Sequence, residues 1–188
     1  MIPQSGRMCC DTSRHVMIRH LHSPDGPRAS MTQYWLMKSE PSAYSWEQLV
    51  KDESTYWDGV RNYQARNLMR DEMNIGDMVL FYHSNCKPPH VAGIARVCRE
   101  AYPDHTAQDP DSKYFDLKAT PDNPRWMMVD IESVQAMVEP VSLPDMRINP
   151  ELEGMLLLQK FCRLSVQTVS VAHFEMICHM GGLSEIPT

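Results

Sequence analysis

The most informative stretch of this chain is Trp57-Asp58-Gly59-Val60-Arg61-Asn62-Tyr63-Gln64-Ala65-Arg66-Asn67, in which aromatic residues, a glycine and arginines alternate. Trp57 and Tyr63 offer planes on which a base can stack, and Gly59 lets the backbone approach a ligand closely. Asn62 is expected to cap a helix whose first amides would face an anion. The stretch therefore predicts a helix start that suits a flat base and its phosphate. The plainer alternative makes Trp57 a core residue and the arginines a solvated helix face.

Length and hydrophobic content limit the classes of protein to which this chain can belong. The chain has 188 residues, of which 43% are hydrophobic, enough for the core of a single domain. It contains no apolar run of the about 18 residues that a membrane span needs, and no signal-like segment at its start. Six cysteines are scattered without a C-x-x-C pair, which indicates reduced thiols. We expect a soluble intracellular protein, nuclear or cytoplasmic, that does not enter a membrane.

The charge balance argues against an indiscriminate coat for nucleic acid. The net charge is −6 and the isoelectric point is about 5.7. Residues 101–188 hold most of the acidic excess, with 13 acidic and 6 basic side chains. By contrast, Arg61, Arg66 and Arg70 gather around the quoted stretch. The pattern predicts a local phosphate-binding patch on an acidic body.

The first 31 residues differ from the rest in composition. They are rich in Pro, Gly and Ser without a helical or alternating pattern, so residues 1–31 are expected to form a flexible extension. Four arginines in residues 1–30 weakly favour mitochondrial targeting, although two aspartates argue against it. No metal is expected at this end, because no zinc spacing matches Cys9, Cys10, His15, His20 and His22.

The first half of the chain predicts alternating strands and helices. Strands are predicted at 34–38, 78–83 and 91–97, and helices at 45–51 and 62–73. Ser45 and Gln48 have the capping-box spacing, and the helix at 62–73 has a buried stripe with arginines on its outer face. Residues 78–83 are apolar on both faces, as a central strand requires.

The second half adds strands around a long polar connection. Residues 101–125 are rich in Pro and Asp, and a loop of this length is usually functional or disordered. Strands are predicted at 126–134 and 163–169, and helices at 151–158 and from Ser170 to Gly181-Gly182. Residues 135–141 either continue the strand before them or pair with it. The element order predicts an α+β protein, a curved mixed β-sheet of five to six strands with helices packed outside.

Several motifs follow one another in the order of a known family. They are Tyr34-Trp35-Leu36-Met37-Lys38-Ser39-Glu40-Pro41, the stretch 57–67, Gly76-Asp77 before Phe81-Tyr82-His83-Ser84, Gly93-Ile94-Ala95 and Arg163-Leu164-Ser165-Val166. With these motifs, residues 33–181 resemble the EVE domain family, a PUA-like group related to YTH domains. The resemblance implies a PUA-like pseudo-barrel at 32–182 and a tail at 183–188. It also implies recognition of a modified nucleobase: methylated or hydroxymethylated cytosine in DNA, or a modified base in RNA.

The resemblance further implies which residues form an aromatic pocket for the base. Its mouth, walls and rim would consist of Lys38, Ser39, Trp57, Val60, Asn62, Tyr63, Tyr82, His83 and Ser84, and the segment from Tyr114 to Trp126 would supply a further lip. Arg61 and Arg66, with Lys38, would meet flanking phosphates. Hydrogen bonds from Ser39, Asn62 or backbone amides would provide base identity.

Three functions from different classes fit the sequence. The favoured one is a non-catalytic, monomeric reader of modified bases in DNA or RNA, without cofactor or metal. The second is a small amidohydrolase acting on a modified nucleoside, because some PUA-like relatives use a lysine and a carboxylate, for which Lys38 and Glu40 are candidates. The third is a protein-interaction domain whose acidic half binds a basic partner. His83 and Ser84 are not expected to form a catalytic pair, since neighbouring strand residues point to opposite faces.

Overall fold

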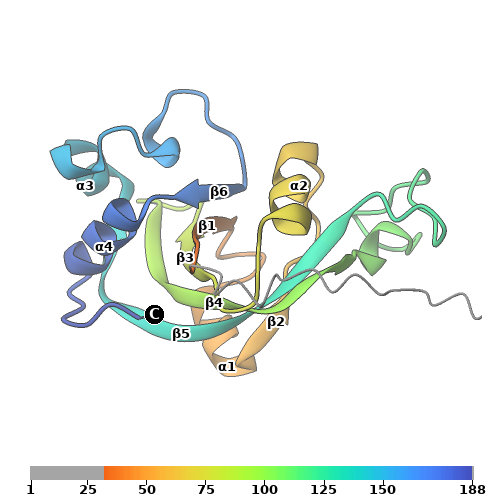
Figure 1. Cartoon of the computed structure of the whole chain (residues 1–188), viewed down its shortest axis with the longest axis horizontal. Helices are drawn as coiled ribbons and strands as arrows, with labels where there is room; N and C mark the ends of the chain where they lie inside the picture. Colours follow the sequence, from red (N-terminus) through yellow and green to blue (C-terminus); the bar gives the residue numbers. More distant parts are fainter. Residues whose placement is uncertain (1–31, 188) are drawn as a thin grey trace, which may run out of the picture. The chain divides into compact units, whose positions relative to one another are not determined.

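The computed structural model describes residues 32–187. The predictions for residues 1–31, which concern the extension, targeting and the Cys/His group, lie outside the described residues. Within 32–187 the chain forms one six-stranded sheet with helices against it (Figure 1). The α+β prediction is confirmed.

The sheet is mixed and strongly curved (Figure 1). Its strands are β1 (Tyr34–Ser39), β2 (Ser54–Tyr56), β3 (Met78–His83), β4 (His90–Pro103), β5 (Met127–Ser142) and β6 (Val166–Val169). They lie in the order β2-β5-β4-β3-β1-β6. β1 runs parallel to β3, whereas the other neighbouring pairs are antiparallel. Register shifts along β4 and β5 increase the local twist and so curve these long strands.

Four α-helices complete the described part of the chain: α1 (Trp46–Asp52), α2 (Tyr63–Asp71), α3 (Leu143–Ile148) and α4 (Val171–Met180). The caps predicted for three of them are confirmed, because side-chain oxygens of Ser45, Asn62 and Ser170 accept backbone amides. The predicted stop at Gly181 is also confirmed. These local signals therefore fix where the helices begin and end.

Some strands and one helix depart from the predictions. β4 and β5 are longer than predicted, and residues 135–141 continue β5 instead of pairing with it. The edge strand β2 has no alternating pattern long enough to predict it. The helix predicted at 151–158 is wrong: two 3-10 turns, Pro150–Leu152 and Leu156–Leu158, stand there. Gly154 lies between them with φ +85°, which interrupts a helix.

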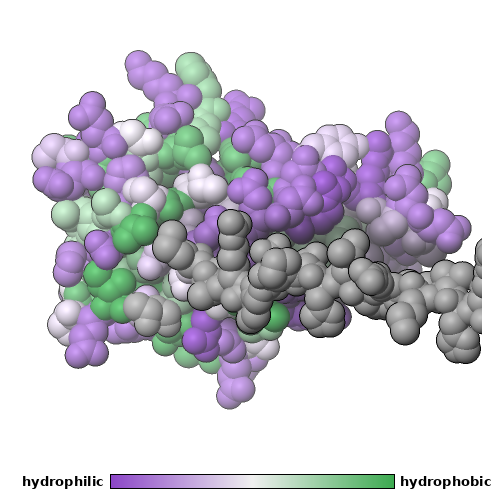
Figure 2. All heavy atoms as spheres, viewed as in Figure 1, coloured by the Kyte–Doolittle hydropathy of each residue, from purple (hydrophilic) through white to green (hydrophobic). Residues whose placement is uncertain are grey.

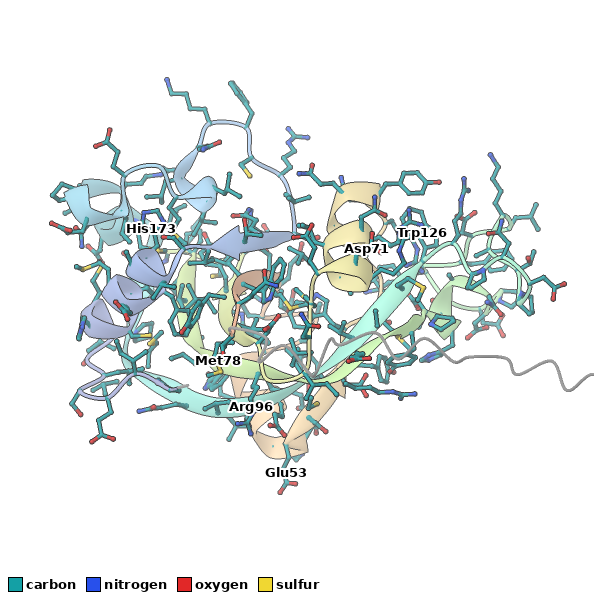
Figure 3. The ribbon with its side chains drawn as sticks, viewed as in Figure 1. Glu53, Asp71, Met78, Arg96, Trp126 and His173 are labelled. Carbon is teal, nitrogen blue, oxygen red and sulfur yellow. The ribbon has the colours of Figure 1, made fainter. Side chains whose placement is uncertain are left out.

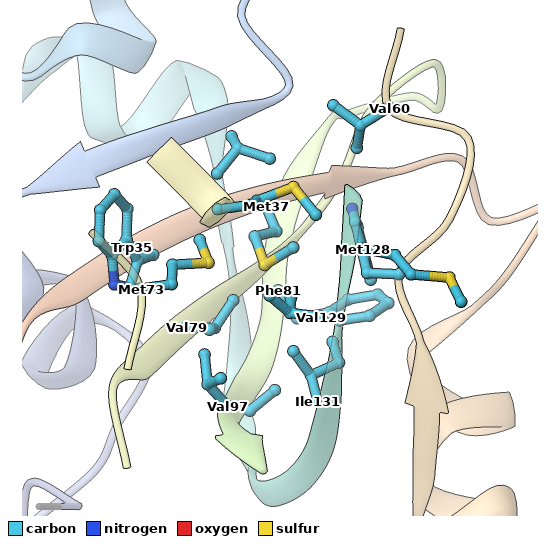
Figure 4. Packing of buried hydrophobic residues seen from close by; sticks show 14 of the residues in the cluster. Trp35, Met37, Val60, Met73, Val79, Phe81, Val97, Met128, Val129 and Ile131 are labelled. Atoms are coloured by element: carbon cyan, nitrogen blue, oxygen red, sulfur yellow. The ribbon is translucent and has the colours of Figure 1, made fainter. Parts of the chain in front are cut away.

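Two hydrophobic clusters cover opposite faces of β1 and β3, because successive strand residues alternate in direction. The tryptophan cluster is built from Trp35, Met37, Trp46, Trp57, Val60, Ala65, Met69, Val79, Phe81, Val129 and Ile131 (Figure 4). The aliphatic cluster is built from Leu36, Met78, Leu80, Tyr82, Ile94, Met137, Val141, Phe174 and Ile177. Full burial of one such large side chain contributes about 1.5–3 kcal/mol. The tryptophan cluster also supports the candidate site.

Candidate nucleic-acid interface

A cleft of about 930 Å³ opens where the ends of β1 and β3 approach the segment 54–61. Its wall contains six residues implied by the resemblance: Lys38, Ser39, Trp57, Val60, Arg61 and Ser84. The other wall residues are Glu40, Ala43, Tyr44, Asp52, Ser54, Thr55, Tyr56, Asp58, Gly59, Lys113, Tyr114, Arg163 and Ser165. Parallel pairing explains the location, since β1 and β3 end at the same sheet edge. There the amide of Ser84 donates to the carbonyl oxygen of Ser39 at 2.7 Å.

Trp57 belongs to the core and to the cleft at once. It is 8% exposed, and its ring meets Phe81 edge-on with the ring centroids 5.5 Å apart. Its backbone amide donates to the carbonyl oxygen of Val129 at 2.8 Å, while the residue also lines the cleft. The two interpretations of Trp57 are therefore compatible. Core packing holds the indole in place, so a base that stacks on it loses little entropy by ordering the wall.

The end of β1 brings a partly buried lysine to the mouth of the cleft. The ammonium of Lys38 donates to the carbonyl oxygen of Cys162 at 3.5 Å. Burial lowers the pKa of Lys38, and the nearby Cys162 opposes this shift only in part. The hydroxyls of Ser39 and Ser84 donate to the carbonyl oxygens of Tyr44 at 2.6 Å and of Ser39 at 3.2 Å. Since an ammonium carries three hydrogens, Lys38 keeps donors for a ligand.

Arg61 joins the cleft to the loop between β4 and β5. Its Nε and Nη2 donate to the carbonyl oxygen of Tyr114 at 2.9 and 2.5 Å, and its Nη1 donates to the carboxylate of Asp104 at 2.7 Å. Longer bonds reach the carbonyl oxygen of Val60 at 3.3 Å and Oγ1 of Thr106 at 3.4 Å. We call this arrangement the Arg61 latch. It uses all five N–H groups of the guanidinium, which leaves little capacity for a phosphate.

Gly59 and Asp104 complete the latch. The amide of Gly59 donates to Asp104 at 3.0 Å, and its φ of +72° favours glycine. A Cβ at Gly59 would lie 2.5 Å from the ring of Tyr114, so glycine lets this ring pack closely. Burial acts to raise the pKa of Asp104, but hydrogen bonds from Thr106, Arg61 and Gly59 outweigh it and the pKa is lowered. Asp104 is therefore held as an anion.

A second group of predicted residues lies at the start of α2, away from the cleft lining. Tyr63 is 47% exposed and stacks on Trp126, with ring centroids 4.9 Å apart. The guanidinium carbons of Arg66 and Arg125 lie 5.0 and 5.6 Å from the Tyr63 ring centroid. Figure 3 shows Trp126 beside α2, next to the start of β5. We call Tyr63, Arg66, Arg125 and Trp126 the stacked patch.

The stacked patch holds two arginines in fixed positions. Arg66 donates to the carbonyl oxygen of Arg125 at 2.6 Å, and Arg125 pairs with Asp116 at 3.4 Å. Asn62 is committed to capping, because its Oδ1 accepts the amide of Ala65 at 3.1 Å. Hydrophilic side chains gather over α2 and the loop beyond it (Figure 2). Guanidinium groups that stack on aromatic rings in this way suit a phosphate ligand.

Tyr82 and His83 do not line the cleft. Tyr82 points into the aliphatic cluster, on the face opposite to Phe81. His83 is buried, and its Nε2 accepts the amide of Trp46 at 3.2 Å. Burial lowers the pKa of His83, and His90 acts in the same direction. His83 therefore holds the start of α1, while the Ser84 hydroxyl donates to Ser39 and has no hydrogen bond with His83 in the part of the chain that the structure describes.

The cleft includes residues that the sequence analysis did not single out. Tyr44 and Tyr56 lie in short segments without a motif. Tyr114, by contrast, was expected at the start of the further lip, and it lines the cleft beside Gly59, which makes room for its ring. Asp58 and Arg163 lie inside the motifs quoted for the resemblance. For these two residues, attention to every polar position of a motif would have been enough.

Residues 32–187 also bear on metal binding, membrane spanning and the state of the cysteines. Within residues 32–187, no three His, Cys, Asp or Glu side chains lie so that they could hold a metal ion. In the same range, no helix is long and apolar enough to cross a bilayer. Its four cysteines (Cys86, Cys98, Cys162 and Cys178) are free thiols.

Comparison with known proteins connects this architecture to one family. Residues 33–180 match the family model of the EVE domain. Thymocyte nuclear protein 1 from Homo sapiens is 36% identical over 167 residues, which cover 79% of this chain and 73% of the human protein. The rat protein of the same name is 38% identical over 167 residues, with the same coverage.

Solved structures agree with the sequence match. A hypothetical protein from Leishmania major has a TM-score of 0.78 and 48% identity, over 82% of this chain and 98% of that chain. Human THYN1, solved in complex with DNA containing 5-methylcytosine, has a TM-score of 0.74 and 36% identity, over 83% of this chain and 100% of that chain. With its PUA-like α+β fold, this chain belongs to the EVE domain family.

Proposed function

We propose that this protein binds DNA and holds a modified base, 5-methylcytosine or a close derivative, in the cleft without catalysis. The cleft itself carries the proposal, since a core-anchored indole lines about 930 Å³ of space beside a lysine and several hydrogen-bonding groups. The choice of base is supported by human THYN1, which was solved with DNA containing 5-methylcytosine. Recognition then takes place on one base that has left the DNA stack.

Stacking and methyl burial would provide the affinity for the base. A flipped base loses its neighbours, and one aromatic contact with Trp57 returns about 1–3 kcal/mol. Burial of the methyl group against an apolar wall such as Val60 adds about 1 kcal/mol. Because this increment is small, methylated and unmethylated DNA should differ about fivefold in affinity.

Phosphates beside the flipped base would meet the stacked patch and Lys38. Arg66 and Arg125 keep N–H groups beyond their protein contacts, whereas the Arg61 donors are committed to the latch. In this proposal Arg61 holds the cleft wall in position, while Lys38, Arg66 and Arg125 contact the phosphates of the DNA backbone. Phosphate contacts of this kind provide affinity and orientation but no base identity.

The proposal also covers the binding partner, the oligomeric state and the cellular location of the protein. The protein acts as a monomer on DNA, and RNA that carries modified bases is the second ligand to test. The name of thymocyte nuclear protein 1, its relative, supports a nuclear location. The acidic surface of residues 101–188 makes protein interaction the competing use of the domain, and loss of DNA binding on a change at Trp57 would argue against it.

An amidohydrolase is the alternative, because Lys38 and Glu40 both line the cleft and burial lowers the pKa of Lys38. Glu40, however, is exposed and accepts a hydrogen bond from Asn85 at 3.3 Å. Solvation of this kind does not prepare a carboxylate to act as a base. Incubation with modified nucleosides separates the two functions: release of product supports the enzyme, and unchanged nucleosides support the reader.

A pair of tryptophan variants tests the proposed function. Trp46 and Trp57 both meet Phe81 edge-on at 5.5 Å, but Trp57 lines the cleft and Trp46 does not. Trp57→Leu should reduce binding to an oligonucleotide with one 5-methylcytosine about tenfold or more, because a stacking plane is lost. Trp46→Leu should destabilise the fold similarly and leave the affinity of the folded protein within about twofold. Equal loss of binding in both variants would contradict a base site at Trp57.

A further inference from the structure

Asp58, next to Trp57, differs from the other carboxylates of the cleft. It is half-buried in the wall, and its hydrogen-bond partner is its own backbone amide. Among residues 32–187, no other side chain or backbone amide donates to its carboxyl. Burial and the neighbouring Asp104 raise the pKa of Asp58, and its own amide, Arg61 and His105 oppose this shift only in part.

The neighbouring acceptors are already occupied. Asp52 accepts from the Tyr44 hydroxyl at 3.0 Å and from Nε2 of Gln48 at 2.7 Å. Asp104 accepts from Arg61, as described for the latch. The five donors of Arg61 are also committed, so Arg61 does not neutralise Asp58 through a hydrogen bond. The carboxyl of Asp58 therefore keeps acceptor capacity in the cleft wall, which a donor group of a ligand can use.

We propose that Asp58 selects the base by accepting a hydrogen bond from an exocyclic amino group, N4 of cytosine in the ligand proposed above. This inference rests on the proposed function and adds base identity to it. Asp58 follows Trp57 directly in the chain, and both residues line the same cleft. A carboxylate accepting from N4 is a known way to read cytosine.

Comparison of 5-methylcytosine with thymine isolates this contact. The two bases share the pyrimidine ring and the 5-methyl group, so stacking on Trp57 and methyl burial are alike. They differ at position 4, where 5-methylcytosine carries an amino donor and thymine a carbonyl acceptor. A carboxylate attracts the donor and repels the acceptor. The protein group that faces position 4 therefore decides whether 5-methylcytosine binds more tightly than thymine.

The test uses two matched variants of the full chain, Asp58→Asn and Asp145→Asn. Binding is measured by fluorescence anisotropy on oligonucleotides that differ at one position, which holds cytosine, 5-methylcytosine, uracil or thymine. The wild-type chain should prefer the amino base of each pair by about tenfold or more. Asp58→Asn should reduce this preference to about twofold or less, since an amide can donate to O4 as well as accept from N4. Asp145→Asn makes the same chemical change on the exposed surface of α3, outside the cleft, and should keep the wild-type preference.

The outcomes separate the inference from the proposed function. If Asp58→Asn keeps the full preference for amino bases while Trp57→Leu loses binding, the base site stands and the role of Asp58 is overturned. If the wild-type chain shows no dependence on the base at all, the proposed function fails first. A circular dichroism spectrum and melting curve for each variant confirm that the folded protein is being compared.

Discussion

The two faces of the central strands differ in what they leave open. The aliphatic cluster is covered by α4 and the C-terminal segment, and the hollow on that side, about 670 Å³, is lined by residues such as Arg147, Ile148 and Leu158. No aromatic residue is among its described lining residues. The tryptophan cluster, in contrast, opens into the cleft at Trp57. One face of the sheet forms a core that is covered by helices, and the other forms both a core and the wall of the cleft from the same side chains.

This difference explains how the wall of the proposed binding cleft is held in place by the hydrophobic core. Phe81 contacts Trp46, Trp57 and His83, each with its ring centroid about 5.5 Å away. The cleft wall is thus fixed by packing that the fold needs in any case. A change at Phe81, which packs directly against Trp57, should affect stability and binding together, whereas a change on the aliphatic face should affect stability alone.

The sharpest test of the comparison uses adjacent residues of β3. Phe81→Ala should destabilise the protein by about 3–5 kcal/mol, and Leu80→Ala by about 2–5 kcal/mol, because both leave a cavity in a packed core. Urea unfolding measures both losses. Among molecules that remain folded, only the Phe81→Ala variant should bind 5-methylcytosine DNA more weakly. Equal binding by the two variants would remove the distinction between the faces.

A smaller loss of stability is expected from a change in the Arg61 latch, which borders the cleft. Asp104→Asn should cost about 2–3 kcal/mol at pH 7, since it breaks a largely buried ion pair with Arg61. The folded pKa of Asp104 is lowered, so its contribution is present above the unfolded pKa near 3.8 and is lost as the pH falls through the folded value. The difference between wild type and variant should therefore narrow below about pH 4.

The contribution of Asp58 to stability should depend on pH in the opposite direction, so Asp58 serves as the control for Asp104. Its folded pKa is raised, so its carboxylate reduces stability as the pH rises from the unfolded pKa through the folded value. Asp58→Asn should therefore leave stability at pH 7 unchanged or slightly higher. Unfolding curves at several pH values compare the two variants, and a parallel response would argue against the distinct environments of these carboxylates.

The smallest expected effect on DNA binding concerns one arginine from each side of the sheet, Arg66 and Arg147. Arg66→Gln should weaken DNA binding similarly for modified and unmodified sequences, and should reduce the slope of log affinity against log salt by about 1. Arg147→Gln, on the aliphatic side, should leave both quantities unchanged. Titrations at several salt concentrations provide the measurement. A change in base preference for Arg66→Gln would contradict its assignment to the DNA backbone.

Local signals in the sequence predicted much of this fold. Residues 78–83 are apolar throughout and form a strand buried along its whole length. Side chains at 45, 62 and 170 cap the helices where capping chemistry places them. The turns at 150–158 were missed: one helix was predicted there, whereas Gly154 and Pro150 favour separate short turns.

The candidate site was less accessible to sequence reasoning. Trp57 was found through its motif, but no sequence pattern shows that it serves the core and the cleft together. Arg61 was expected to meet phosphate, although the structure commits its donors to a loop more than forty residues away in the chain. Tyr63 and Trp126 were expected in the pocket and instead stack on each other. Contacts between distant segments decide such roles, and a single sequence does not record them.

The Arg61 latch changes what the long loop between β4 and β5 can tolerate. Because the loop is fastened at Asp104 and again at Tyr114, its free spans are short. Leu117, which is 83% exposed, lies beyond the second fastening point and before Trp126. A protease that cuts there would leave both new ends tied to the body of the protein. Insertions or deletions in these spans of the loop would therefore change the edge of the cleft without disturbing the cleft wall.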